Sequence, residues 1–303
     1  MEMISNFIKE QKLSNDYRFN CVDYWLPLAA KLQKILTTKT AHGSQKPIVL
    51  GINGCQGSGK STLAQFLEAA LKETGLNTAT LSLDDFYLSP EARVALAEKI
   101  HPLFRTRGVP GTHDVGLALR KFQDLLDITK TSVLLPRFDK ALDKPAQENV
   151  WPIAPRPLDL IILEGWFVGA QPQPDNDLIA PVNDLEKNED PEAIWRTYAN
   201  QFLAQEYKLL FSKIDILIML RAPDFHSVFT WRNNQEKKLR STKEFTGRQH
   251  KKIMSEREVK DFIKYFERLT LHCLKTIPLQ ADMIFDLDQN QKVIKKSGHL
   301  GLG

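Results

Sequence analysis

The chain has 303 residues, a length that suits one large α/β domain with insertions or two smaller domains. Its net charge of +4 is the small difference between 41 basic and 37 acidic residues, which argues against nucleic acid or a membrane surface as a partner. Hydrophobic residues make up 42% of the chain, yet no apolar run approaches the roughly 18 residues that span a bilayer. The three cysteines lack metal-like spacing and the first residues lack a signal-peptide pattern, so we expect a reduced, cytoplasmic protein.

The first 46 residues predict helices and a tether, with no sign of chemistry. Apolar residues recur at helical spacing in two stretches, residues 4–8 and residues 25–36. Residues 37–45 are polar and indicate a loop. We therefore expect residues 1–46 to form a helical extension that packs on a core beginning at residue 47.

A glycine-rich stretch follows a short β-branched run at residues 47–53 and precedes a helical pattern that ends at Gly75. It fits G-x-x-x-x-G-K-[ST], in which backbone N–H groups close around phosphate oxygens at a helix N-terminus. Lys60 would reach the β- and γ-phosphates of ATP, and the Ser61 hydroxyl would ligate Mg²⁺. The predicted ATP-binding residues are Gly54, Cys55, Gln56, Gly57, Ser58, Gly59, Lys60, Ser61 and Thr62.

Cys55 inside this loop has two interpretations. It is a small residue that simply fits, or it is a reactive thiol whose pKa is lowered by the nearby helix N-terminus.

Acidic residues follow two of the predicted strands. Residues 78–83 lead into Asp84 and Asp85, and residues 158–163 lead into Glu164. Because the carboxyl ends of parallel strands face the ligand crevice, we expect Asp84 to accept a proton from a substrate hydroxyl, and both Asp84 and Glu164 to hold Mg²⁺. A solvated turn or a helix cap is the structural alternative.

Two loops carry the candidates for contacts to the substrate. Residues 107–114 form a glycine–proline loop that runs into a helix, for which Asp114 equally suits a structural cap. Residues 133–140 predict a short strand that turns into charges, with a local salt-bridge patch as the alternative. Such residues suit a small anion. The candidate substrate-binding residues are Asp85, Tyr87, Arg107, His113, Arg137, Asp139 and Lys140.

The rest of the chain predicts two further strands and a basic connection between helices. Residues 170–191 are rich in Pro, Asn and Asp and indicate the largest loop insertion, and residues 214–220 and 283–287 indicate strands. Residues 232–255 carry many basic side chains. They form either a solvated face or a lid that brings an arginine onto the transferring phosphate.

Several motifs together resemble one family. They are the phosphate loop, Ser82-Leu-Asp-Asp-Phe-Tyr87, residues 107–114, Pro136-Arg-Phe-Asp-Lys140 and Leu163-Glu-Gly-Trp166. The set resembles the P-loop kinase superfamily of uridine kinase, phosphoribulokinase and pantothenate kinase. Within it the chain is most similar to the plant-type D-glycerate 3-kinases and their kinase-like relatives, from about residue 47 to residue 288.

The resemblance implies an α/β three-layer sandwich, with a mostly parallel five-stranded sheet in the order 2-3-1-4-5, helices on both faces and a helical lid. Residues 47–303 would be the kinase domain, with ATP and Mg²⁺ as cofactors and Asp84 at the position of the family's proposed base. The implied activity is transfer of the ATP γ-phosphoryl group to a hydroxyl of a small acid, D-glycerate giving 3-phosphoglycerate. Neither nucleic acid nor a membrane is an expected partner, and no motif addresses the oligomeric state.

Two alternatives remain at this point. The insertion at residues 175–190 is longer than expected for a glycerate kinase, which leaves an acceptor of the uridine or pantothenate kind open, although a nucleoside would call for aromatic stacking. A non-catalytic nucleotide-dependent switch is the other alternative. A GTPase switch would carry D-x-x-G after the third strand, where this chain has Glu164-Gly165.

Overall fold

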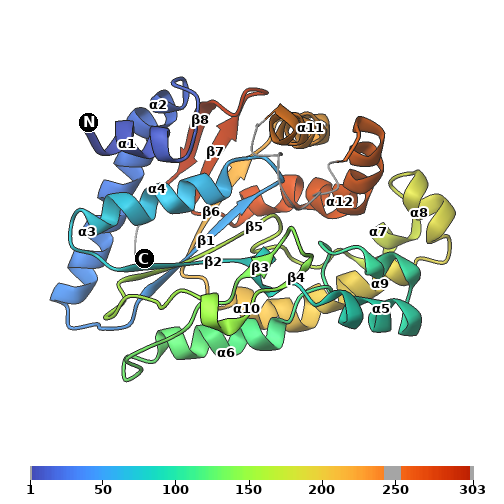
Figure 1. The fold of residues 1–303 in the computed structure, drawn as a ribbon, viewed down its shortest axis with the longest axis horizontal. Helices are drawn as coiled ribbons and strands as arrows, with labels where there is room; N and C mark the ends of the chain where they lie inside the picture. The colour runs from blue at the N-terminus through green and yellow to red at the C-terminus, as the bar shows by residue number, and fades with distance from the viewer. Residues whose placement is uncertain (1, 242–253, 301–303) are drawn as a thin grey trace.

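The computed structural model describes residues 2–241 and 254–300, and within these residues a six-stranded sheet in the order β2-β5-β1-β6-β7-β8 forms the centre of the fold (Figure 1). The five parallel strands are β1 (Ile48–Gly54), β2 (Thr78–Ser82), β5 (Leu160–Gly165), β6 (Ile216–Arg221) and β7 (Met283–Leu287). Their order is the predicted one. The sixth strand, β8 (Val293–Gly298), pairs antiparallel with β7 and was not predicted, because most of its side chains are exposed and leave no hydrophobic pattern.

Side chains alternate along the central strands between two hydrophobic clusters, one on each face of the sheet. In β5, Leu160 and Ile162 belong to the first cluster, whereas Ile161 and Leu163 belong to the second. Strands buried on both faces require a helical layer on each side. The sheet has such layers, so the predicted three-layer α/β sandwich is confirmed.

Helices from different parts of the chain form the two layers. The first cluster receives α1 (Glu2–Glu10), α3 (Leu26–Ala41), α4 (Lys60–Lys72) and α11 (Phe225–Ser241). The second receives α6 (Val115–Leu126), α10 (Lys208–Phe211) and α12 (Glu256–Thr276). Two further helices, α5 (Pro90–Lys99) and α9 (Ile194–Phe202), lie beyond the carboxyl edge of β2 and β5 (Figure 1). No helix in the described ranges is both long and apolar enough to cross a bilayer.

The N-terminal helices pack on the first face of the sheet. After α1, the short helix α2 (Tyr17–Asn20) and a π-helical turn lead directly into α3. The ring of Trp25 lies edge-on to Phe285 of β7, with centroids 4.9 Å apart. The loop predicted for residues 37–45 was wrong in its first half, because α3 continues to Ala41. The hydroxyls of Thr37 and Thr40 donate to carbonyls one turn back, so these polar residues remain helical.

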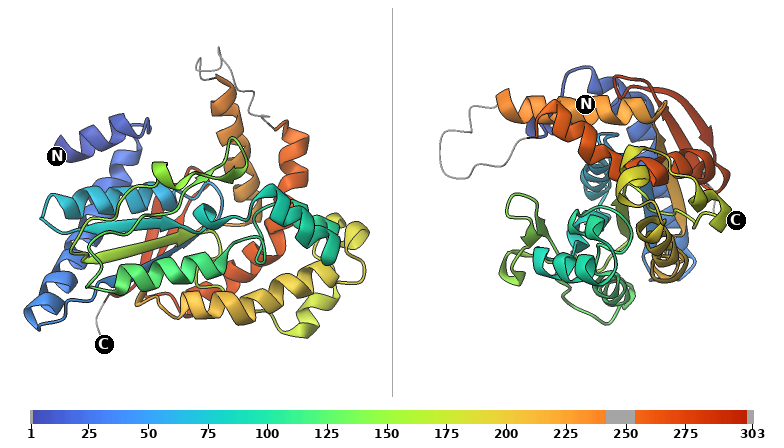
Figure 2. Two further views of the ribbon diagram at one scale, coloured as in Figure 1. Left: turned by 60° about the horizontal axis from the view of Figure 1, so that its bottom comes forward. Right: turned by 90° about the vertical axis from the view of Figure 1, so that its right-hand side faces the viewer.

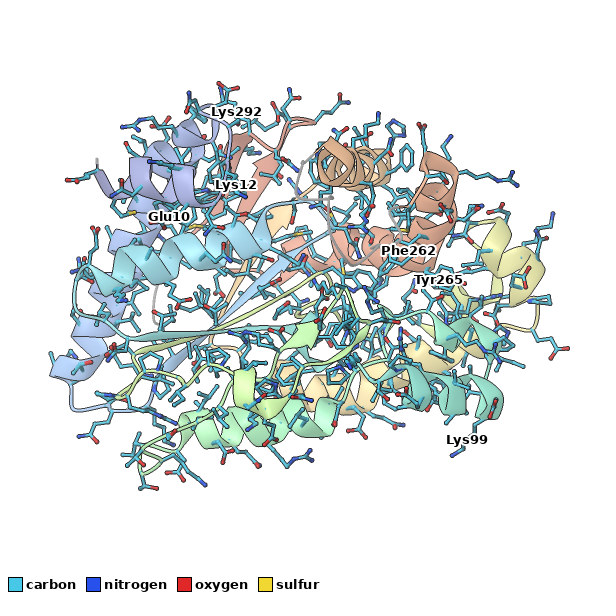
Figure 3. All side chains as sticks on the ribbon, viewed as in Figure 1. Glu10, Lys12, Lys99, Phe262, Tyr265 and Lys292 are labelled. Atoms are coloured by element: carbon cyan, nitrogen blue, oxygen red, sulfur yellow. The ribbon has the colours of Figure 1, made fainter. Side chains whose placement is uncertain are left out.

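One hydrogen-bonded chain joins this N-terminal segment to the phosphate loop. The Asn20 side chain donates to the carbonyl of Gln291 at 2.9 Å and accepts from the Val293 N–H at 3.0 Å. The Gln291 side chain in turn donates to the carbonyl of Gly57. Lys292 lies in the same region, beside the N-terminal helices (Figure 3). The domain boundary at residue 46 stays a prediction, but the contacts run across it.

The insertion at residues 170–191 contains two short helices, α7 (Asp175–Ile179) and α8 (Asp184–Glu189), where a loop was predicted. Helices of one or two turns show too little apolar periodicity to be recognised. Arg268 of α12 fixes the insertion, because its guanidinium donates to both carboxylate oxygens of Glu186 at 2.7 Å. The same guanidinium also donates to the carbonyls of Asp177 and Ala180.

The stretch predicted as a strand at residues 133–136 forms only an isolated bridge between Leu134 and Ile153. A small antiparallel ribbon follows it, made of β3 (Phe138–Asp139) and β4 (Lys144–Pro145). We call residues 138–145 the hairpin.

Half of the lid predicted for residues 232–255, residues 242–253, lies outside the described residues. The parts that are described belong to the end of α11 and to a capping box of Ser255 and Glu258, which begins α12. These two helices lie side by side and project from the same side of the molecule (Figure 2).

Asn20→Ala should lower the free energy of unfolding by about 1–3 kcal/mol, because it leaves the buried Val293 N–H without its acceptor. Urea denaturation followed by circular dichroism measures the change. Asn290→Ala is the matched control, since Asn290 is exposed in the neighbouring turn. Equal losses in the two variants would contradict the structural role of Asn20.

Candidate active site

The phosphate loop joins β1 to the first turn of α4, which is the placement that phosphate binding at a helix N-terminus requires. Gly57 and Gly59 have φ values of 81° and 89°, which favour glycine. A Cβ atom on Gly57 would lie only 2.6 Å from Cβ of Trp231 on α11. The backbone path of the loop therefore depends on its glycines and on the helix that packs against it.

Cys55 is 5% exposed, and burial raises the pKa of its thiol to about 12. The nearby charge of Lys60 only partly opposes this effect. A thiol that stays protonated is a poor nucleophile. The reactive-thiol alternative is therefore wrong, and Cys55 acts as a small buried residue of the loop.

Ser61 and Glu164 meet where the first turn of α4 faces the end of β5. The Ser61 hydroxyl donates to Glu164 Oε1 at 2.7 Å, and Lys60 Nζ lies 3.9 Å from Glu164 Oε2. Glu164 is 4% exposed, and its Oε2 accepts no hydrogen bond within the described part of the chain. A buried carboxylate oxygen that lacks a donor, beside a serine hydroxyl, fits Mg²⁺ or a water bound to it.

Phosphate oxygens would have to complete such a metal site. Within residues 2–241 and 254–300, no cluster of three His, Cys, Asp or Glu side chains could hold an ion by itself. Mg²⁺ commonly uses one or two carboxylates together with substrate phosphates. Both carboxylate oxygens of Asp84 are engaged by other side chains, so its predicted role as a metal ligand stays a prediction.

Asp84 lies in the 3₁₀ turn that follows β2. The Tyr87 hydroxyl donates to its Oδ1 at 2.8 Å, and Lys140 Nζ donates to its Oδ2 at 2.5 Å. Burial alone would raise the pKa of Asp84, but the charges of Lys140 and Lys60 and these hydrogen bonds hold the pKa below its ordinary value. Asp84 is therefore ionised in neutral solution, with both of its oxygens bound by side chains of the protein.

The carboxylate of the neighbouring Asp85 makes its contacts within the protein. It closes a capping box with Ser82 and accepts from the Phe138 N–H at 3.3 Å. Its other partner is Arg137, at 3.3 Å. Burial raises the pKa of Asp85 to about 6, and the charge of Arg137 offsets this only in part. These contacts fix the 3₁₀ turn and the hairpin, so the structure argues against the predicted substrate contact for Asp85.

His113 is also structural in this geometry. Its ring stacks on Tyr87 with centroids 4.5 Å apart, and its Nδ1 lies 2.7 Å from the Tyr207 hydroxyl. Burial lowers the pKa of His113 to about 3, although the charge of Asp84 opposes the shift. A neutral imidazole cannot hold an anion by charge, so the structure argues against this part of the predicted role of His113. His113 instead supports the ring of Tyr87 from behind.

Of the other predicted substrate residues, Asp139 has a structural role, whereas Arg107 lies at the site. Asp139 accepts from the N–H groups of Ala141 and Leu142, which makes it a turn residue of the hairpin. Arg107 reaches the site, because its guanidinium lies 5.9 Å from the ring centroid of Tyr87 and 5.5 Å from that of Phe138.

Two further residues contact the group around Arg107 and were not predicted from the sequence, Asp143 and Arg93. Asp143, at the tip of the hairpin, binds both Arg107 and the buried Arg93 of α5. No motif or spacing could have connected them, since Asp143 lies 50 residues from Arg93 and 36 from Arg107.

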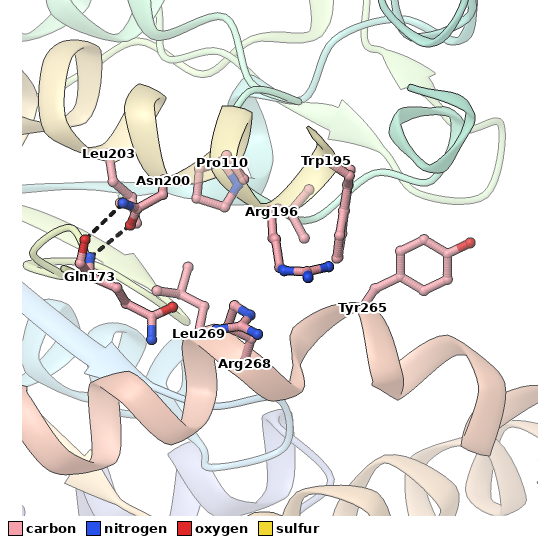
Figure 4. Close-up of a pocket in the computed structure, with 11 residues that line it drawn as sticks. Pro110, Gln173, Trp195, Arg196, Asn200, Leu203, Tyr265, Arg268 and Leu269 are labelled. Atoms are coloured by element: carbon pink, nitrogen blue, oxygen red, sulfur yellow. Dashed lines mark hydrogen bonds between the residues drawn. The ribbon is translucent and has the colours of Figure 1, made fainter. Parts of the chain in front are cut away.

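A small pocket between α9 and α12 contains no residue of the phosphate loop in its lining and is not the nucleotide site (Figure 4). Its volume of about 30 Å³ leaves room for little more than a water molecule. The two guanidiniums in its wall already have carboxylate partners, Arg196 with Asp190 at 3.0 Å and Arg268 with Glu186 at 2.7 Å.

Residues 26–274 match the KAP family P-loop domain, a stretch that includes the phosphate loop and Glu164. The chain is 34% identical over 229 residues to the uncharacterized kinase mug58 of Schizosaccharomyces pombe, covering 73% of this chain and 79% of that protein. It is 31% identical over 229 residues to the chloroplastic D-glycerate 3-kinase of Arabidopsis thaliana, covering 73% of this chain and 46% of that protein. The matched region thus spans about half the length of the plant relative.

Among solved structures, the D-glycerate 3-kinase from Cryptococcus neoformans is similar with a TM-score of 0.74 at 24% identity. The superposition covers 91% of this chain and 99% of that one. A likeness at this level of identity establishes a shared fold over the superposed 91% of the chain.

We expect the imidazole of His113 to stay neutral down to about pH 4, because burial opposes its charged form. Long-range ¹H–¹⁵N NMR of the histidine side chains, assigned with His113→Gln, measures its titration. Since the unfolded chain binds this proton near pH 6.5 and the folded chain near pH 3, His113 should cost stability as the pH falls between these values. A midpoint above pH 5, or an unchanged acid dependence of stability in His113→Gln, would contradict the burial argument.

Proposed function

From the premise that the chain belongs to the P-loop kinase family of the D-glycerate 3-kinases and their kinase relatives, we propose that its phosphoryl acceptor is D-glycerate. The protein is an ATP-dependent phosphotransferase, and the product of the proposed reaction is 3-phosphoglycerate. The observation that carries the proposal is the grouping of Asp84, Tyr87, Lys140 and Arg107 around one position next to Lys60. A carboxylate to orient a hydroxyl lies there beside a guanidinium that suits a small acid.

The phosphoryl donor would be held at the start of α4. Backbone N–H groups of the loop and the ammonium of Lys60 would contact the β- and γ-phosphates of ATP. Ser61 and Glu164 would hold Mg²⁺, which supplies charge neutralisation at the phosphates when bound. Lys60 and Glu164 lie 3.9 Å apart, so one ammonium can serve both the phosphate and the buried carboxylate.

Asp84 would act on the acceptor. Its lowered pKa makes it a weak base but a reliable hydrogen-bond acceptor, and Tyr87 fixes the orientation of its carboxylate. When an acceptor hydroxyl replaces Lys140, the loss of that charge raises the pKa of Asp84. Asp84 then becomes a better proton acceptor at the stage when the hydroxyl attacks the γ-phosphate.

Asp84→Asn should lower kcat by about 10² to 10⁴-fold while ATP binding changes little, because the change keeps the shape and removes the proton acceptor. A loose phosphoryl-transfer transition state would place the effect at the lower end. Steady-state kinetics and calorimetric titration with ATP–Mg²⁺ measure the two quantities. Asp85→Asn is the matched neighbour and should chiefly lower thermal stability. If Asp85→Asn causes the larger fall in kcat, the assignment is reversed.

ATP turnover against D-glycerate, glycerol, uridine and pantothenate tests the acceptor. We expect turnover with D-glycerate, and Arg107→Lys should raise its KM more than about tenfold, since an ammonium cannot replace a two-point guanidinium contact. Arg137→Lys should have a smaller effect, because Arg137 is engaged by Asp85. Arg105→Lys, an exposed neighbour, is the control. Phosphorylation of uridine or pantothenate without D-glycerate would overturn the proposal.

A further inference from the structure

The carboxylate of Asp143 lies between two arginines that come from different parts of the chain. Arg93 Nη2 of α5 donates to Oδ2 at 2.5 Å, and Arg107 Nη1 donates to Oδ1. Each carboxylate oxygen thus has its own guanidinium. Charge-assisted contacts of this kind are among the strongest that a protein can offer to a carboxylate.

The two sides of this contact are buried to very different extents. The side chain of Arg93 is 4% exposed, whereas that of Asp143 is 41% exposed. Arg93 Nε is buried and has no hydrogen-bond partner within the described residues. A buried guanidinium needs an anion, so Arg93 requires a carboxylate at this position whatever its source. Arg93 is therefore a buried part of the fold, whereas its partner Asp143 is a partly exposed surface residue.

The hairpin that supplies this anion also supplies the cation on Asp84. Lys140 lies at one end of the hairpin turn and binds Asp84, and Asp143 lies at the other end and binds the two arginines. The ring of Tyr87 connects the two contacts, because its hydroxyl donates to Asp84 and the Arg107 guanidinium lies near the ring. One short segment therefore occupies both the hydroxyl-orienting carboxylate and the carboxylate-binding arginines.

The hairpin is suited to leaving this position. Its two strands have two residues each, and a ribbon of this size is marginally stable on its own. Asp143 has a φ of 53°, a left-handed conformation that Asp and Asn tolerate better than most residues. Phe138 anchors the base of the hairpin to Asp85, whereas residues 140–143 at its tip are joined to the rest of the described protein by the ion pairs of Lys140 and Asp143.

We propose that Arg93 and Arg107 form the carboxylate-binding site for the acceptor, and that Asp143 occupies this site until the acceptor replaces it. The inference rests on the proposed function in taking a small acid as the acceptor. Arg93 is then a specificity-determining residue, and Asp143 is an internal competitor. Binding of the acid releases the tip of the hairpin, residues 140–143, which also withdraws Lys140 from Asp84.

Asp143→Asn tests the competition, because Asn tolerates the same backbone conformation but cannot form the ion pairs. Calorimetric titration with D-glycerate should give a dissociation constant lower than that of the wild type by roughly threefold or more, since the competing state is weakened. Glu148→Gln, an exposed acid just beyond the hairpin, should leave the constant unchanged. An unchanged or weaker affinity in Asp143→Asn would overturn the proposal.

Arg93→Lys tests the site itself and keeps the charge. We expect it to weaken D-glycerate binding about tenfold or more while leaving the affinity for ATP unchanged. Wild-type affinity for D-glycerate in a folded Arg93→Lys protein would overturn the role of Arg93. Thermal unfolding verifies the fold, and if this variant does not fold, the affinity of Asp143→Asn decides the proposal alone.

Binding and turnover separate this inference from the proposed function. If D-glycerate binds with the expected pattern across the variants but is not phosphorylated, the proposed function fails and the carboxylate site stands. If D-glycerate is phosphorylated but Asp143→Asn binds it no better than the wild type, the inference fails and the proposed function stands. Glycerol, which lacks the carboxylate, should show no dependence on Asp143 in the same titrations.

Discussion

The carboxylate of Glu164 is buried at the end of β5, and a buried charge is costly unless cations and hydrogen-bond donors surround it. Its partners, Lys60 and Ser61, both lie in the first turn of α4. This requirement ties the start of the helix to the end of a neighbouring strand, and so holds the phosphate loop between them. Glu164 Oε2 accepts no hydrogen bond within the described residues, so the requirement is met only in part without a metal ion or a bound water.

A second set of charges, Asp84 and Arg93, also requires counter-ions but obtains them from a different part of the structure. The ion-pair partners of Asp84 and Arg93, Lys140 and Asp143, come from the hairpin, a small surface segment, and Lys60 of α4 adds a further positive charge near Asp84. When a small surface segment balances the charges of a site, the site is stable without a ligand. A ligand of matching charge can then bind by displacing that segment. Under the proposed function, such a ligand would carry a hydroxyl for Asp84 and a carboxylate for the arginines, as a small hydroxy acid does.

The sequence predicted the features that depend on neighbours along the chain. The five parallel strands were visible as apolar runs, and Asp114 was visible as a cap because a cap acts within three residues of itself. Features that depend on distant partners were not predictable. His113 lost its expected charge through burial beside Tyr207, a contact across 94 residues.

The hydrogen bonds from Asn20 to Gln291 and from Gln291 to Gly57 have a thermodynamic consequence. These two hydrogen bonds connect the N-terminal helices to the phosphate loop, so a change in one can affect the stability of the other. Coupling between two sites is reciprocal. If packing of the N-terminal helices stabilises the conformation of the loop that binds a nucleotide, then a bound nucleotide stabilises the packing of those helices by the same free energy.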